Sequence, residues 1–319
     1  MKILIAPLNW GLGHATRCIP IIDFYLSRGD EVVLAGDGDS MTLLRKRYPH
    51  LRHVELPHLR LHYSKSNSQT LTLLRQLPHL VCWMIQDHYA LQQLISMEMF
   101  DKVVSDNRFA FYSKHTTCVY LTHQLHICLP KRWRWLESAA EAVHRKIMRH
   151  YAEVWVPDKE QEPSLAGVLS HPKRRLANVR YIGPISRFMS IETMPQADMS
   201  YHTVLLLSGL EPQRTCLEKA VVERYEALEE TLLVVQGRPQ AAYCKFTRKN
   251  VTVVPYMSDT QLLPYLLGAE KIIARSGYSS IMDFATLGVL SKCEFVPTPG
   301  QTEQEYLAEI HGTSCFFSF

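Results

Sequence analysis

Short apolar runs alternate with longer helical patterns along the first 125 residues. Runs rich in β-branched residues predict strands, and apolar residues spaced three and four positions apart predict the helices between them. This alternation is typical of βαβ units, which build a parallel sheet. The expected strands are residues 3–6, 31–35, 102–105 and 118–122, with a further strand at 153–156, and the expected helices are residues 15–28 and about 70–97.

A loop-rich segment with several prolines and Gly183-Pro184 follows, and we interpret it as an interdomain connection. A second alternation of strands and helices then begins. Its expected strands are residues 203–207, 231–235, 251–254, 271–274 and 292–296, and its expected helices are near residues 215–228, 258–267, 279–287 and 302–310.

The chain has 319 residues, more than the roughly 250–300 at which a single hydrophobic core stops growing. We therefore predict an α/β protein with an N-terminal Rossmann-like domain at residues 1–160, a connection at 161–200 and a C-terminal Rossmann-like domain at 201–319. Two such doubly wound domains are expected to face a central cleft, because these sheets bind ligands beyond the carboxyl ends of their strands.

Composition places the chain among globular proteins. An apolar fraction of 46% with 21% charged residues excludes a disordered or collagen-like chain. No window holds 18 consecutive apolar residues, and the N-terminal residues do not form a signal peptide. The eight cysteines form no C-x-x-C motif and are expected to be reduced. We expect a cytoplasmic protein, with peripheral attachment to the inner face of the cell membrane as an open alternative.

The turn after the first strand carries a candidate general base. Gly11-Leu12-Gly13-His14 opens a helix, but Thr16 stands where a dinucleotide fingerprint has its third glycine. The positive end of a helix keeps an imidazole neutral, which suits a base that accepts a proton. The alternative for His14 is a capping or packing residue.

Asp106 follows the strand at 102–105 and is expected at the same sheet edge as His14. A carboxylate there can orient the imidazole, although a helix cap is the alternative. His123 ends the next strand, and no third ligand can be placed beside it and His126, so neither a metal nor another cofactor is expected. The acceptor-side candidates at this edge are Gly11, Gly13, Arg17, Arg108 and His123.

The second domain carries polar motifs at consecutive strand ends. Arg275-Ser276-Gly277 opens a helix that includes Asp283, and a helix N-terminus beside an arginine favours a phosphate group. Asp283 can accept hydrogen bonds from ribose hydroxyls. Gln301 and Gln304 follow the next strand and suit sugar hydroxyls. Each motif alone could be an ordinary loop or cap, but together they suggest a nucleotide-sugar pocket.

These motifs resemble the MurG-type glycosyltransferases, family 28, of the GT-B fold. The resemblance rests on Gly11-Leu12-Gly13-His14, on Arg275-Ser276-Gly277 with Asp283, and on Val296-Pro297 followed by Gln301 and Gln304. The stretch from Gly13 to Cys18 is also similar to related nucleotide-sugar hydrolases. The resemblance implies an acceptor-binding N-terminal domain, a C-terminal domain that binds a UDP-sugar, and no required metal.

The resemblance also implies roles for single residues. His14 matches a proposed base, and Asp283 matches an acid that binds the ribose. Gln304 matches a glutamine that contacts the donor sugar, and Met257 lies where the family's backbone holds the uracil. Arg187 loosely matches an arginine near the diphosphate, and Ser208-Gly209 stands in place of a longer glycine-rich loop.

We therefore expect a glycosyltransferase of the hexosyltransferase class that transfers a sugar from a UDP-sugar to an acceptor hydroxyl, with inversion and without a metal. A nucleotide-sugar hydrolase or 2-epimerase on the same fold and a non-catalytic relative are the alternatives. The family continues beyond the segment where this chain ends, at Cys315–Phe319. We accordingly expect a truncated C-terminal domain.

The formal net charge of +4 comes from one segment. Residues 131–149 hold six basic and two acidic residues, whereas the rest of the chain holds 29 of each. Tryptophans among basic residues predict an anchor for anionic lipid, which would suit a lipid-linked acceptor or an envelope glycan. The alternative is a solvated basic helix whose tryptophans pack on the sheet. Nucleic-acid binding is not expected. The anchor residues are Lys131, Arg132, Trp133, Arg134 and Trp135.

Overall fold

The structure, a computed structural model, describes residues 1–59, 76–209 and 211–312. The described residues form two compact α/β units. The first contains residues 1–9, 14–59 and 76–185, and the second contains residues 10–13, 186–209 and 211–312. The expected truncation at Cys315–Phe319 and the start of the helix expected from residue 70 lie outside the described residues.

The first unit is built on a parallel sheet with the strand order β3-β2-β1-β4-β5-β6-β7. Each neighbouring pair of these strands is parallel, so all the carboxyl ends meet at one edge. The strands are β1 (Lys2–Pro7), β2 (Glu31–Gly36), β3 (Arg52–Glu55), β4 (Lys102–Asp106), β5 (Thr117–Leu121), β6 (Glu153–Val156) and β7 (Val179–Tyr181).

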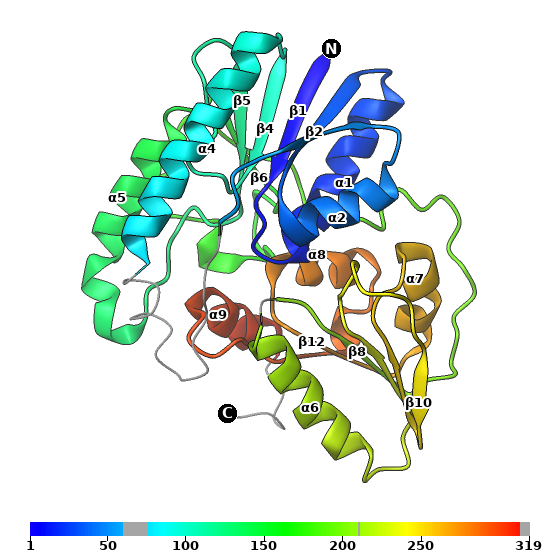
Figure 1. Cartoon of the computed structure of the whole chain (residues 1–319). Helices are drawn as coiled ribbons and strands as arrows, with labels where there is room; N and C mark the ends of the chain where they lie inside the picture. The colour runs from blue at the N-terminus through cyan, green and yellow to red at the C-terminus, as the bar shows by residue number, and fades with distance from the viewer. Residues whose placement is uncertain (60–75, 210, 313–319) are drawn as a thin grey trace. The chain divides into compact units, whose positions relative to one another are not determined.

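Helices cover both faces of this sheet. Figure 1 shows α1 and α2 on one face and α4 and α5 on the other. Leu91 of α4 and Met148 of α5 are buried in one core cluster with Leu4 and Val103 of the sheet. The bounds are α1 (Leu12–Ser27), α2 (Gly38–Arg47), α4 (Leu77–Met97) and α5 (Glu137–Met148), with short 3₁₀ helices η1 (Lys131–Leu136) and η2 (Gly167–Leu169).

Two strands and one α-helix of the first unit were not predicted from the sequence. The three-residue β7 lies within the segment that we interpreted as a connection, and it pairs with β6 at the edge of the sheet. In β3 only Val54 is apolar, and α2 ends in three consecutive basic residues. Such short or polar segments carry too few apolar residues for their periodicity to be recognised.

The second unit contains a sheet with the strand order β10-β11-β9-β8-β12-β13. The pairs are parallel except for β10 and β11, which form an antiparallel pair at the edge. The strands are β8 (Thr203–Leu206), β9 (Leu232–Val235), β10 (Phe246–Arg248), β11 (Val251–Val254), β12 (Lys271–Ala274) and β13 (Cys293–Phe295). The prediction of a two-domain α/β protein with parallel sheets is confirmed.

The helices of the second unit fall close to the predicted positions. In α6, Leu217, Val221 and Tyr225 recur every four residues and join the core with Leu205 and Val234. The bounds are α6 (Gln213–Tyr225), α7 (Asp259–Gly268), α8 (Tyr278–Thr286) and α9 (Thr302–His311), with the 3₁₀ helix η3 (Leu290–Lys292). No helix in the described part of the chain is both long and apolar enough to cross a membrane.

Candidate functional site

The carboxyl edge of the first sheet brings His14 and Asp106 together. Asp106 is the last residue of β4, and its backbone pairs with Pro7 at the end of β1. The chain then turns sharply at Gly11, whose φ of +92° suits glycine, and enters α1. His14 lies in the first turn of α1, where backbone N–H groups have no partner within the helix. Neighbouring parallel strands therefore deliver both side chains to one place.

Asp106 is shared between His14 and Arg17. His14 Nδ1 lies 3.2 Å from Asp106 Oδ1. Arg17 Nε donates to Asp106 Oδ2 at 2.8 Å, and Arg17 Nη2 contacts both Oδ1 and, at 2.9 Å, His14 Nδ1. The Asp106 side chain is completely buried and that of Arg17 nearly so, whereas the His14 side chain is 15% exposed. The histidine is thus the member of the cluster that solvent or substrate can reach.

The charges around Asp106 keep it ionised. Burial alone raises the pKa of a carboxyl group, but the charges of Arg17 and His14 outweigh burial here and lower the pKa of Asp106 to about 2. In the tautomer with a proton on Nδ1, His14 donates to this carboxylate, and Arg17 Nη2, which can only donate, then makes no hydrogen bond to Nδ1. That tautomer leaves Nε2 of His14 with a lone pair for a proton.

Arg17 and His123 lie inside the protein rather than on an open surface. Their exposed fractions are 3% and 4%, and Arg17 Nη1 lies 3.4 Å from His123 Nδ1. Arg17 therefore acts on the site by holding Asp106. Among the described residues, no group of three histidine, cysteine or acidic side chains could hold a metal ion.

Arg108 forms a separate buried network. Its side chain is fully buried and donates to Asp87 Oδ1 and Oδ2 at 2.6–3.1 Å. A further contact joins Arg108 Nη1 to Asp37 Oδ1 at 3.3 Å. Burial raises the pKa of Asp87 although Arg108 opposes the shift. Arg108 thus binds two carboxylates within the unit.

The other end of this network was not predicted from the sequence. Asp37 follows β2, and its Oδ2 lies 2.5 Å from Nδ1 of His58. The position of Asp37 after a predicted strand is the same signal that identified Asp106. His58 follows β3, and no signal for it was available because that strand was not predicted.

The second unit places its candidate residues at four strand ends. Each group follows the carboxyl end of a parallel strand, which is where α/β sheets bind ligands. Ser208 and Gly209 follow β8, Met257 follows β11, Arg275, Ser276 and Gly277 follow β12, and Gln301 and Gln304 follow β13.

Asp283 and Arg187 form a buried pair in the second unit. Ser186 Oγ donates to Asp283 Oδ1 at 2.6 Å, and Arg187 Nε donates to Oδ2 at 3.0 Å. Arg187 Nη1 also lies 3.2 Å from Asp259 Oδ1. Burial raises the pKa of Asp283 although Arg187 opposes it. Both Asp283 oxygens already hold a partner, but a carboxylate offers about four lone-pair positions.

Arg275, which follows β12, hydrogen-bonds backbone carbonyls of the loop after β13 and of the first residue of α6. Its guanidinium donates to the oxygens of Val296, Pro297 and Gln213 at 2.7–3.2 Å, and burial lowers its pKa to about 10. Ser276 Oγ donates to the backbone oxygen of Gln304, whose Oε1 accepts from Thr298 N at 2.8 Å. These bonds fix the shape of the loops that follow β12 and β13.

Comparison with known proteins gives a glycosyltransferase relative and a glycosyltransferase fold. No protein-family model matches the chain. A protein of Methanosarcina acetivorans described as an uncharacterized glycosyltransferase is 25% identical over 331 residues, which cover 97% of this chain and 81% of the relative.

Two solved structures share the fold at low identity. The spinosyn rhamnosyltransferase SpnG, complexed with thymidine diphosphate, matches with a TM-score of 0.61 at 12% identity, covering 97% of this chain and 84% of that chain. Arabidopsis thaliana UGT89C1, complexed with UDP-L-rhamnose, matches with a TM-score of 0.58 at 12% identity, covering 98% and 84%. The chain has the two-domain GT-B fold. The comparisons support glycosyltransferase function for it.

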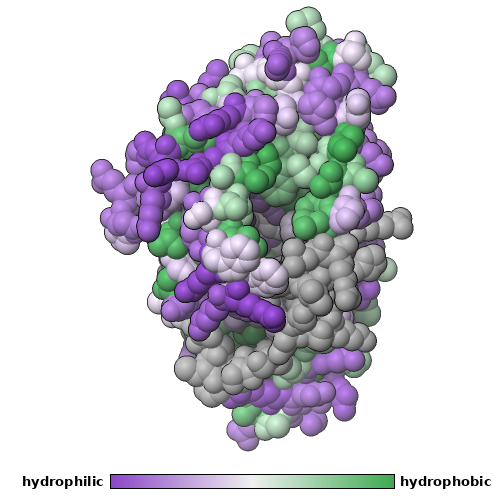
Figure 2. Space-filling view, turned by 90° about the vertical axis from the view of Figure 1, so that its left-hand side faces the viewer, coloured by the Kyte–Doolittle hydropathy of each residue, from purple (hydrophilic) through white to green (hydrophobic). Residues whose placement is uncertain are grey.

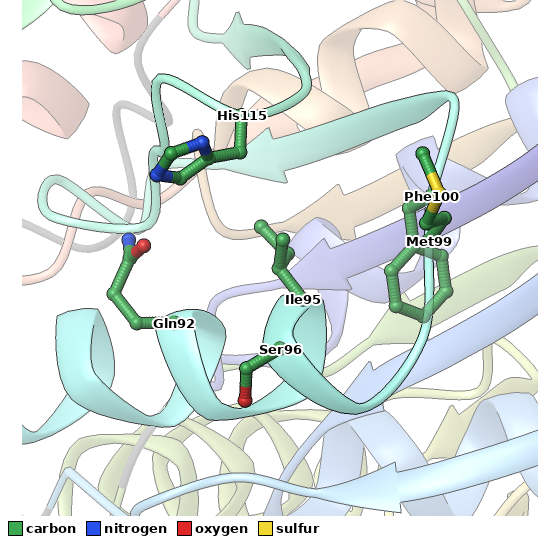
Figure 3. A pocket seen from close by; sticks show the side chains of 6 residues that line it. All are labelled: Gln92, Ile95, Ser96, Met99, Phe100 and His115. Atoms are coloured by element: carbon green, nitrogen blue, oxygen red, sulfur yellow. The ribbon is translucent and has the colours of Figure 1, made fainter.

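A hollow of about 390 Å³ lies away from the candidate residues of the first unit. Figure 3 shows its lining, which comes from the end of α4 and from the segments that precede β4 and β5. It therefore lies at the amino ends of these parallel strands, whereas His14 and Asp106 lie at the carboxyl ends. The lining residues are Gln92, Ile95, Ser96, Met99, Phe100 and His115.

Proposed function

We propose that the chain transfers a sugar from a UDP-sugar to an acceptor hydroxyl with inversion, in the manner of the MurG-type glycosyltransferases of family 28. The observation that carries the proposal is the pairing of His14 with an ionised, buried Asp106 at the carboxyl edge of the first sheet. Nε2 of His14 takes the hydroxyl proton as the acceptor oxygen attacks the anomeric carbon. The bond from that carbon to the diphosphate breaks, and UDP leaves with the electron pair.

The second unit supplies the donor-binding groups in this proposal. The N-terminus of α8, at Gly277, offers backbone N–H groups to the diphosphate. Arg275 holds the loops in place, and the remaining lone pairs of Asp283 accept a ribose hydroxyl. Gln301 and Gln304 lie beside the sugar, and the backbone at Met257 meets the uracil. Arg187 and the turn at Ser208-Gly209 lie near the diphosphate.

A panel of UDP-sugars tests the donor proposal. Present at about 100 times its Kd, a bound ligand stabilises the native state by about 2.7 kcal/mol, so the correct donor should raise the Tm by several degrees. The same donor should release UDP only slowly until a hydroxyl acceptor is added. Full-rate release of free sugar without acceptor would instead identify a hydrolase. A chain that neither binds nor cleaves any UDP-sugar would be a non-catalytic binding protein.

We also propose that η1 and α5 bind an anionic membrane surface that presents the acceptor. Trp135 is 74% exposed, in contrast to the alternative in which it packs on the sheet, and the three basic residues of η1 are exposed as well. His144 and Met148 form the buried face of α5, and burial lowers the pKa of His144 to about 4, so its ring is neutral when buried. The apolar side chain of Val143 is 62% exposed.

Helix α4 adds an apolar stripe on the same face of the first sheet. Leu77, Val81, Ile85 and Tyr89 recur every four residues along the helix, and each is 47–65% exposed. Residues at this spacing share one side of a helix. Figure 2 views this side of the molecule and shows exposed apolar side chains next to strongly hydrophilic ones. An apolar stripe beside a basic segment matches the chemistry of an anionic lipid surface.

Vesicle co-sedimentation tests the membrane proposal. Replacing Lys131, Arg132 and Arg134 by alanine should weaken binding to vesicles with anionic lipid by about 100-fold, because each basic residue near such a surface contributes about 1 kcal/mol. The Trp133/Trp135 double alanine variant should weaken binding to all vesicles. Tyr243→Ala, which removes a 67% exposed aromatic ring from the second unit, is the matched control. Equal sedimentation of wild type and both variants would contradict the proposal.

A further inference from the structure

Five neighbouring strands of the first sheet end in an alternating row of histidines and aspartates. In the spatial order β3, β2, β1, β4, β5, the residues at or after the strand ends include His58, Asp37, His14, Asp106 and His123. The His58–Asp37 pair comes from two neighbouring strands, as does the His14–Asp106 pair. We propose that His58 is an acceptor-binding residue that accepts a hydrogen bond from a second hydroxyl of the acceptor.

Asp37 holds the imidazole of His58 in a fixed direction. Asp37 is 4% exposed, and its Oδ2 lies 2.5 Å from Nδ1 of His58 and accepts from Asn9 Nδ2 at 3.2 Å. The other oxygen of Asp37 faces Nη1 of the buried Arg108 at 3.3 Å. A guanidinium thus contacts each aspartate, although Arg17 reaches both oxygens of Asp106 and Arg108 reaches one oxygen of Asp37.

The His58 imidazole is partly exposed and bonds Asp37 through Nδ1 alone among the described residues. Its side chain is 44% exposed, and no described residue hydrogen-bonds its Nε2. With Nδ1–H donated to Asp37, Nε2 carries the lone pair and accepts from a hydroxyl. A buried carboxylate that fixes an exposed imidazole in this way prepares a directed hydrogen-bond acceptor at little cost in side-chain entropy.

The strand order indicates that His58 and His14 meet different hydroxyls. The strands β3 and β1 are separated by β2, and their carboxyl ends lie at the same edge of the sheet. Asp37 holds the His58 ring and Asp106 holds the His14 ring, so each imidazole has its own carboxylate. The acceptor class is therefore a polyhydroxyl compound such as a sugar ring, with a second free hydroxyl besides the reacting one.

This inference rests on the proposed transfer reaction and is tested with that reaction's donor. Methyl hexopyranosides and their monodeoxy derivatives serve as acceptors for the wild type and for His58→Ala. For the wild type, deletion of one hydroxyl other than the reacting one should lower kcat/KM about 10-fold, close to the upper range for a neutral hydrogen bond. In His58→Ala the same deletion should have no effect, because the partner of that hydroxyl is already absent.

Further variants separate binding from structure. His58→Gln should keep the discrimination, because its amide oxygen can accept the hydroxyl near the position of Nε2, whereas His58→Phe should lose it. His50→Ala removes an exposed imidazole before β3, at the amino edge of the sheet, and should behave as wild type. All four variants should retain the wild-type affinity for UDP, and His50→Ala should also retain the wild-type Tm.

The outcomes distinguish the inference from the proposed function. Equal losses for wild type and His58→Ala at every deoxy position would overturn the role of His58. Donor consumption by the wild type without transfer to any hexopyranoside would overturn the acceptor class. If the wild type binds and consumes no UDP-sugar, the proposed transfer function itself fails, and the inference fails with it.

Discussion

Replacing His14 by alanine is expected to lower the rate of sugar transfer by about 10²–10⁴-fold, the range that general base catalysis contributes. The expected loss is in kcat, because His14 acts on the acceptor proton in the transition state and has no role in holding the nucleotide. Asp106→Asn should produce a similar loss, since an amide cannot select the Nδ1–H tautomer as a carboxylate does. Steady-state kinetics with the UDP-sugar found by screening measures both.

Two controls accompany the His14 variant. Calorimetry should give the same Kd for UDP in wild type and His14→Ala, which shows that the donor-binding unit is intact. His115→Ala removes an exposed histidine at the amino edge of the same sheet and should leave kcat unchanged. Unchanged turnover in His14→Ala would remove the basis for the proposed reaction.

Replacing Arg108 by leucine is expected to lower the free energy of unfolding by about 3–5 kcal/mol, because it leaves the Asp87 and Asp37 carboxylates buried without their guanidinium. For a domain of this size such a loss corresponds to a fall in Tm of roughly 10 °C. The loss should be smaller at acidic pH than at neutral pH, because burial raises the pKa of Asp87 and its protonated form tolerates burial. Thermal denaturation at several pH values measures the effect.

Two further variants serve as controls for Arg108→Leu: one breaks an exposed ion pair, and the other removes both partners of the buried pair. Arg45 pairs with Glu55 where both side chains are exposed by 44% and 66%, so Arg45→Leu should cost less than about 1 kcal/mol. The combined Arg108→Leu and Asp87→Leu variant should recover part of the stability, because an apolar pair replaces a broken ion pair. A Tm for Arg108→Leu within 2 °C of wild type would contradict the role assigned to this network.

The strands that could be predicted from the sequence are those with continuous apolar runs. The runs at β1 and β8 are buried on both sides of their sheets, so nearly every residue is apolar. The edge strands β3, β7 and β10 are short and carry polar or exposed residues, and their pairing partners determine their conformation. The sequence contains no local signal for that pairing. A unit boundary lies between Ile185 and Ser186, shortly after β7.

The site residues that could be predicted are polar residues at the ends of predicted strands. His14 and Asp106 lie at ends of predicted strands, and parallel pairing of β1 with β4 is enough to bring them together. The partners of the charged residues could not be predicted, because they depend on burial. Arg17 was expected to face an acceptor and instead lies beneath Asp106, and Arg275 donates to backbone carbonyls within its own unit.

The contact between Arg17 and His14 affects the step in which His14 loses its proton after each transfer. Before the reaction the charges of Arg17 and Asp106 cancel, and uptake of the acceptor proton gives the cluster a net charge of +1. The guanidinium nitrogen 2.9 Å from Nδ1 repels the new imidazolium. The ring must return its proton to solvent before the next transfer, and the 15% exposed His14 side chain gives solvent a path to it, whereas Arg17 and Asp106 are buried.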